Sequence, residues 1–241
     1  QAAVPAVDYP LSTECYADWD EVIGALEKQK PYWQPGTRAG YHLLTFGWLN
    51  GEVVRRVSGK SLGTFFREEI AEPLGLDFWI GLPEHLDNEV APTEPAPPDP
   101  DKDFFKALLD TDSLQTHGLL HFGDYMSTGA GFNSKVAHRA EIGGAGGITN
   151  ARGLAGMFAP LANGGSLNGA EIVDDKTLTV MARTSSAFAT DTRLTMPPTY
   201  TLRFMKTFDN RRQPLGRRST SIPAHTVLSA VCHRTSVGCS A

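Results

Sequence analysis

The amino-acid sequence predicts an α+β fold that consists mainly of helices, with few strands. Amphipathic periodicity typical of helices recurs along the chain, whereas only two short segments have the character of strands. No internal repeat is found. The 241 residues are enough for one large domain or two small ones with a sizeable core.

The first helix is predicted to begin after Asp18. Glu21 follows three residues later, as in a capping box. An apolar stripe at helical spacing then supports the helix: Trp19, Val22, Ile23 and Leu26. Pro31 ends it, and Pro35-Gly36 forms a turn.

A longer helix is predicted over residues 41–57, and Gly59 ends it as a left-handed cap. Its apolar residues fall on one side: Phe46, Leu49, Val53 and Val57. Ser61 is expected to cap the next helix, whose inward residues are Leu62, Phe65, Phe66 and Ile70.

The remaining elements are shorter. Residues 78–80 are predicted to be a short strand or extended segment, and a proline-rich stretch over 92–100 is predicted to be an irregular surface loop. Further helices are predicted over 104–109, 149–161 and 174–181. The alternating segment 200–206 is predicted to be a half-buried strand.

Composition excludes several classes of protein. The net charge of −5 argues against a general nucleic-acid binder, and no run of 18 apolar residues predicts a membrane span. The three cysteines have no zinc-site spacing, and their odd, sparse count indicates either a reducing compartment, with the cytoplasm favoured, or simply the lack of a disulfide framework. After Asp209 there is no acidic residue, and residues 210–241 are predicted to be a disordered basic tail rich in Arg, Ser and Thr.

The common nucleophile and metal motifs are absent from the chain. It contains no G-x-S-x-G, S-x-x-K, H-E-x-x-H or phosphate-binding loop, and residues 143–147 are interpreted as a tight glycine turn. His117 and His121 share a helix face, but no third ligand stands at a diagnostic spacing, so no metal site is predicted. His138, next to Arg139 and Glu141, fits either a general base or a loop histidine hydrogen-bonded to these neighbours, and the residues do not separate these roles.

Tyr41 follows the Pro35-Gly36 turn and is predicted to stand at the very start of a helix. The positive end of the helix dipole there favours a tyrosinate. A lone tyrosine in this place is also commonly an amphipathic anchor.

The run PGTRAGYHLLTFGWLNGEVVRRVSGKSLGTFFREEIAEPLGLDFWIGLP, within residues 33–83, resembles the serine β-lactamase-like hydrolases. It is most similar to the esterases and lipases related to class C β-lactamases and penicillin-binding proteins. A second block, residues 138–147 with the helix ending in LANGG, also fits, and the strand at 202–204 fits less well. The resemblance covers most of residues 16–208.

The resemblance implies a β-lactamase/transpeptidase-like fold, in which an antiparallel sheet flanked by helices lies beside a mostly helical domain. It implies acyl transfer by a serine of S-x-x-K. Tyr41 matches the catalytic Tyr of a Y-x-N-like motif, and Leu43 stands where the lactamases have Asn. The substrate-binding residues expected by resemblance are His42, His138, Gly146 and Gly147. No cofactor is implied.

Two family motifs are missing, since neither S-x-x-K nor the late Lys-Thr-Gly or His-x-Gly strand motif occurs. We therefore expect residues 1–209 to be a partial hydrolase domain, truncated at both ends, that self-associates through exposed sheet edges. The predicted function is hydrolysis of small carboxylic esters. The alternative is a catalytically silent fragment or a non-catalytic binding member. Tyr41 is expected to point its hydroxyl into a cleft beside residues 141–147.

Overall fold

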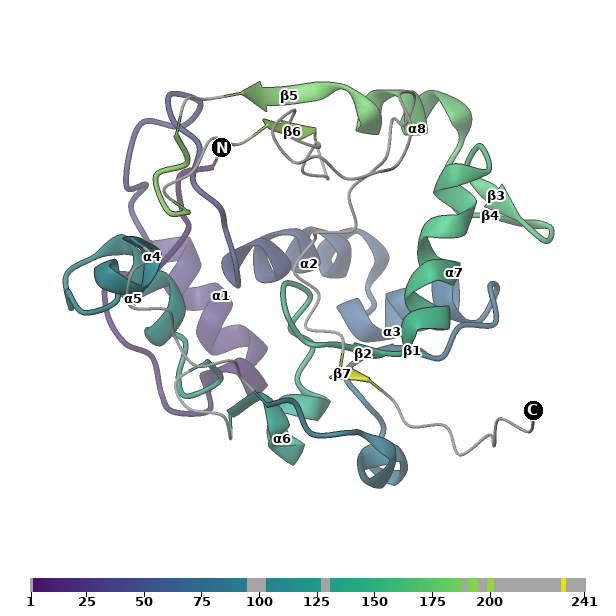
Figure 1. Ribbon diagram of the computed structural model, residues 1–241, viewed down its shortest axis with the longest axis horizontal. Coiled ribbons are helices and arrows are strands. Elements are labelled where there is room, and N and C mark those ends of the chain that lie inside the picture. Colours follow the sequence, from purple (N-terminus) through teal and green to yellow (C-terminus); the bar gives the residue numbers. More distant parts are fainter. Residues whose placement is uncertain are drawn as a thin grey trace.

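The computed structural model describes residues 2–94, 103–126, 131–187, 190–194, 199–201 and 231–232. Helices dominate this part of the chain and the strands are short (Figure 1), which confirms the predicted α+β class. The helices are α1 (Trp19–Lys28), α2 (Thr45–Ser58), α3 (Leu62–Phe66, continued by a π-helical turn at Arg67–Ala71), α4 (Asp103–Ala107), α5 (Leu114–Leu120), α6 (Lys135–Arg139), α7 (Ala151–Ala162) and α8 (Asp175–Ala182). Short 3-10 turns occur at Cys15–Ala17, Glu84–Glu89 and Gly131–Asn133.

The strands form three small sheets. They are β1 (Phe78–Ile80), β2 (Gly147–Thr149), β3 (Ser166–Leu167), β4 (Ala170–Glu171), β5 (Thr184–Ala187), β6 (Thr199–Thr201) and β7 (Val231–Cys232). β1 and β2 pair antiparallel, with Trp79 opposite Ile148, and β7 lies parallel to the other edge of β2. Antiparallel pairs also join β3 to β4 and β5 to β6.

The sequence-predicted elements beyond these bounds have mixed outcomes. The helix predicted over 149–161 begins two residues later, at Ala151, because Thr149 belongs to β2 and Asn150 caps the helix. The predicted strand at 200–206 overlaps β6, and its remainder lies outside the described residues. Residues 95–100 of the proline-rich loop also lie outside them. Most of the predicted tail, residues 210–241, also lies outside the described residues. The part of the tail that is described is β7.

Local capping follows the sequence signals. The Asp18 carboxylate accepts a hydrogen bond from the Glu21 backbone N–H at 3.0 Å, and the Ser61 hydroxyl caps α3 through the Thr64 N–H. Gly59 ends α2 with φ +72°, in the left-handed region that favours glycine. The stripe on α1 is buried as predicted at Val22, Ile23 and Leu26. These four predictions are confirmed.

The larger core forms where α1, α2 and the segments around α5 and α6 meet. Trp48 of α2 stacks on Phe122 with ring centroids 5.3 Å apart, and both side chains are buried. A smaller core packs Phe66 of α3 and Leu154 of α7 with Phe78 of β1. Helices α3 and α7 therefore lie beside the β1–β2 pair (Figure 1).

The predicted start of α2 is wrong. The helix begins at Thr45, so Tyr41 precedes its first turn. The apolar row on one side is largely solvent-exposed, since Phe46, Val53 and Val57 are 43%, 61% and 79% exposed. The buried side instead carries two glycines together with Trp48.

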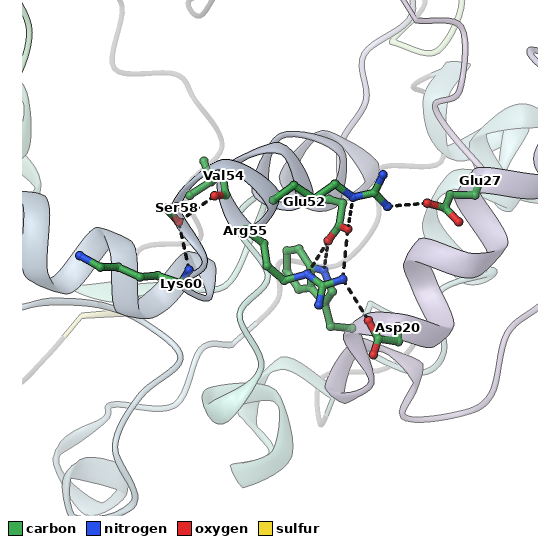
Figure 2. Close-up of polar contacts among 9 residues, drawn as sticks. Asp20, Glu27, Glu52, Val54, Arg55, Ser58 and Lys60 are labelled. Carbon is green, nitrogen blue, oxygen red and sulfur yellow. Dashed lines mark hydrogen bonds and ion pairs between the residues drawn. The ribbon is translucent and has the colours of Figure 1, made fainter.

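An ion-pair cluster joins α2 to α1 (Figure 2). The Glu52 carboxylate accepts hydrogen bonds from Arg55 Nε at 2.7 Å and Arg56 Nε at 2.6 Å, and also from the indole of Trp19. The two arginines reach on to α1: Arg55 pairs with Asp20, and Arg56 pairs with Glu27. The hydrogen bond from Arg55 is the main reason that the pKa of Glu52 falls to about 2, against the opposing effect of burial.

Candidate active site

Residues 141–147, the glycine turn, connect α6 to β2. The Gly146 N–H donates to the Ile142 carbonyl at 2.6 Å, which closes the turn, and Gly147 then pairs with Ile80 in the sheet. The tight turn predicted from the glycines is confirmed, although it leads into a strand before the next helix. Gly146 and Gly147 are thus held by backbone hydrogen bonds, and their substrate-binding role stays a prediction.

The glycine turn packs directly against the start of α2. A side-chain carbon at Gly47 would overlap the Gly144 backbone, and one at Gly144 would lie 2.5 Å from the Leu43 carbonyl oxygen. The Glu141 carboxylate fixes the other side of the turn, because it accepts hydrogen bonds from the Ser61 hydroxyl and the Gly63 N–H, each at 2.7 Å. The two sequence blocks, about a hundred residues apart in the chain, therefore meet in space.

Tyr41 lies just before this junction and is half-buried. Its backbone N–H donates to Asp191 Oδ1 at 3.1 Å, and its carbonyl accepts from Arg193 Nη1 at 3.3 Å. Leu43, two residues after Tyr41, is the residue whose carbonyl lies against Gly144, and the prediction that Tyr41 itself neighbours residues 141–147 stays a prediction. The predicted direction of its hydroxyl stays a prediction.

Asp191 and Arg193 are the residues at this site that sequence reasoning missed. Both are buried, at 0% and 1% exposure. Burial lowers the pKa of Arg193 to about 10, while the negative charges of ionised Tyr41 and Asp191 act in the opposite direction. No motif or periodicity in the sequence points to either residue.

His42 is engaged at both ring nitrogens. Nδ1 lies 2.6 Å from the Gly40 carbonyl oxygen and acts as the donor, while Nε2 accepts from the Val4 N–H at 3.2 Å. Burial lowers its pKa to about 4. In this conformation neither nitrogen is available to a substrate, and the ring instead ties the N-terminal segment to the Tyr41 turn. The substrate-binding role of His42 stays a prediction.

We expect nuclear magnetic resonance of the His42 ring nitrogens to show the Nδ1–H tautomer at pH 7 and a titration midpoint near pH 4. Between pH 6.5 and 4 the unfolded chain binds a proton that the folded chain does not, so folding stability falls as the pH falls through this window. Thermal melts of the His42→Gln variant should depend less on pH there. A midpoint near 6.5 would contradict the burial described above.

His138 lies in α6 and is buried. Its Nδ1 is 3.2 Å from Asp87 Oδ1, and Arg139 binds the other oxygen of the same carboxylate at 2.6 Å. Nε2 is buried with no hydrogen-bond partner among the described residues. His138 is hydrogen-bonded, but it lies in a helix rather than a loop, and its partner Asp87 is 51 residues away rather than adjacent in the sequence. Its predicted substrate-binding role stays untested.

His117 and His121 do share a face, as predicted. Their rings stack with centroids 4.3 Å apart. His121 Nδ1 donates to the Val7 carbonyl at 2.8 Å, and the Tyr32 hydroxyl lies 3.4 Å from His117 Nδ1. Within the described part of the chain, no three His, Cys, Asp or Glu side chains gather in a way that would hold a metal ion.

None of the helices in the described part of the chain combines the length and the apolar character that crossing a bilayer requires.

Comparison with known proteins identifies the architecture. The family model described as Beta-lactamase matches residues 1–220. A curated protein of Mycobacterium tuberculosis (strain ATCC 25618 / H37Rv), named "Esterase/beta-lactamase LipL", is 31% identical over 169 residues, covering 66% of this chain and 38% of that protein. A crystal structure of a family VIII carboxylesterase has 32% identity and a TM-score of 0.75, over 87% of this chain and 53% of that one. A penicillin-binding protein homologue from Caulobacter crescentus has 27% identity and a TM-score of 0.67, with the same coverages of 87% and 53%.

The fold and the paired sequence blocks define a chain of the β-lactamase/transpeptidase-like class. The protein belongs to the beta-lactamase family. It spans 38% of the length of the curated relative and about half, 53%, of the two solved structures.

Proposed function

We propose that this chain forms part of a hydrolase that cleaves small carboxylic esters by acyl transfer. The observation that carries the proposal is the junction of the Tyr41 segment with the glycine turn, which brings together the two blocks typical of the family. The likeness to a family VIII carboxylesterase, at 32% identity, favours an ester as the substrate. Leu43, in place of the lactamase Asn, agrees with this, because it removes a polar group that would recognise a lactam.

In this proposal Tyr41 is the catalytic residue that exchanges a proton with a serine nucleophile. The chain itself contains no S-x-x-K sequence, so the serine and lysine must be supplied to it. A phenol is suited to this step when its hydroxyl lies within about 2.6–3.2 Å of the nucleophile. The backbone N–H and carbonyl of Tyr41 are both hydrogen-bonded, and these bonds fix the backbone that carries the phenol.

The second candidate is a catalytically silent fragment or a non-catalytic binding member of the family. The absence of S-x-x-K from the 241 residues favours it. The two candidates differ in what happens when the missing motif is provided, since only the first predicts a gain of turnover.

The test is a chimera in which an S-x-x-K segment from a full-length relative is fused ahead of this chain. We expect the chimera to hydrolyse p-nitrophenyl butyrate, and Tyr41→Phe to lower kcat by about 10²–10⁴-fold, the usual contribution of a positioned proton-transfer group. Tyr9→Phe is the matched control, because Tyr9 is 80% exposed. A folded chimera without turnover supports the silent alternative, and an unchanged rate in Tyr41→Phe excludes the assigned role.

A further inference from the structure

A single short segment, residues 190–194, holds both backbone polar groups of Tyr41. Asp191 Oδ1 accepts the Tyr41 N–H at 3.1 Å, and Arg193 Nη1 donates to the Tyr41 carbonyl at 3.3 Å. These side chains come from 150 and 152 residues further along the chain. The backbone N–H and carbonyl of the proposed catalytic tyrosine are therefore both bound by side chains, not by the backbone of a helix or strand.

The segment that does this is itself fixed. Asp191 Oδ1 also accepts the backbone N–H groups of Arg193 at 2.9 Å and Leu194 at 2.8 Å, so the carboxylate folds the segment around itself. The Thr192 N–H donates to the Ala39 carbonyl at 2.9 Å, and the Gln115 side-chain amide of α5 donates to the Arg193 carbonyl at 2.9 Å. A rigid support of this kind is what an exact orientation of Tyr41 requires.

The guanidinium of Arg193 lies against α5 at a place where only a glycine fits. A side-chain carbon at Gly118 would lie 2.6 Å from Arg193 Cζ and 2.7 Å from Nη2. Nη2 is buried without a hydrogen-bond partner among the described residues. Burying an arginine that is incompletely paired is unfavourable, and an apolar side chain of similar size commonly serves packing as well or better. Packing alone therefore does not account for a positive charge at this position.

We propose that Asp191 and Arg193 are positioning residues that fix the backbone of Tyr41, and that the buried Arg193 guanidinium, 3.3 Å from the Tyr41 carbonyl oxygen, places a positive charge beside this tyrosine. The electrostatic coupling is reciprocal: ionised Tyr41 favours the charged form of Arg193, so the guanidinium favours ionised Tyr41 to the same extent. The part of this inference that concerns proton transfer rests on the proposed function. The positioning role is tested without ester hydrolysis, so it and the proposed function can be contradicted separately.

The first experiment follows the phenol of Tyr41 in the intact chain by ¹³C resonance of tyrosine labelled at Cζ, assigned with Tyr41→Phe. We expect Arg193→Met to raise the titration midpoint of Tyr41 by about one pH unit, a tenfold lower acidity, because a nearby cation is lost. Arg193→Lys keeps the charge and should leave the midpoint within about 0.3 of the original. Arg152→Met is the matched control, because Arg152 lies exposed on α7.

The second experiment measures hydrogen exchange at the Tyr41 amide. Asp191→Ala should accelerate exchange there by about tenfold or more, while the buried Val22 amide of α1 is unaffected, because one specific acceptor is removed. Asp191→Asn keeps an acceptor oxygen and should restore most of the protection. An unchanged Tyr41 midpoint in folded Arg193→Met overturns the proposal. Equal acceleration at Tyr41 and Val22, or none at Tyr41, also overturns it, and this measurement decides alone if Arg193→Met does not fold.

Discussion

The 241-residue chain, assayed by itself, is expected to hydrolyse p-nitrophenyl acetate or butyrate no faster than its own Tyr41→Phe variant. None of its lysines is preceded by a serine at the S-x-x-K spacing. Loss of a serine nucleophile lowers kcat by about 10⁶-fold, which corresponds to about 8 kcal/mol of activation free energy. Tyr41 cannot replace that contribution, because a proton-transfer group supplies only about 10²–10⁴-fold.

The same assay with nitrocefin should give the same result, since acyl transfer to a lactam requires the same nucleophile. A fluorophosphonate probe serves as the second readout, because it labels an activated serine whatever the substrate. Stoichiometric labelling of one residue, together with turnover well above that of Tyr41→Phe, would show that the chain contains a nucleophile outside the motifs considered.

The local signals in the sequence predicted three helix ends correctly. The caps at Asp18 and Ser61 and the left-handed Gly59 involve contacts within three or four residues, so the sequence contains both partners of each interaction. The tight turn at residues 143–147 was predictable for the same reason.

The orientation of α2 could not be predicted in this way. Its apolar residues fall on one side, but the side that is buried contains Gly47 and Gly51, where other groups approach closely. A side-chain carbon at Gly51 would lie 2.6 Å from the Trp19 ring, and one at Gly47 would meet Gly144. Glycine gives no hydrophobic signal, so the periodicity of the apolar side chains does not indicate which side of α2 is buried.

The residues of the candidate site likewise fall into those that the sequence indicated and those that only the fold shows. Tyr41 and the glycine turn were found because they belong to recognisable runs of sequence. Asp191 and Arg193 were not, because their partner is 150 or more residues away and an isolated arginine is usually solvated. Only the folded chain shows that these charges are buried and aimed at the Tyr41 peptide.

The contact between Gly47 and the glycine turn leads to the second large effect. Gly47→Ala is expected to destabilise the fold by about 3 kcal/mol, the upper end for overpacking, because the new methyl group would overlap the backbone of Gly143 and Gly144. Backbone cannot rotate aside as a long side chain can. The usual gain of about 1 kcal/mol for Gly→Ala inside a helix is too small to offset this overlap. The measurement is the free energy of unfolding from urea denaturation monitored by circular dichroism.

Gly24→Ala in α1 is the matched control, because it is also a glycine inside a helix but has no atom within 4 Å of the added carbon. It should stabilise the protein by about 0.5–1 kcal/mol, through helix propensity alone. Equal and small effects of the two substitutions would mean that the glycine turn does not lie against α2, and the junction on which the proposed site depends would then be absent. The packing of the two blocks requires that the free energy of unfolding falls strongly in Gly47→Ala and rises slightly in Gly24→Ala.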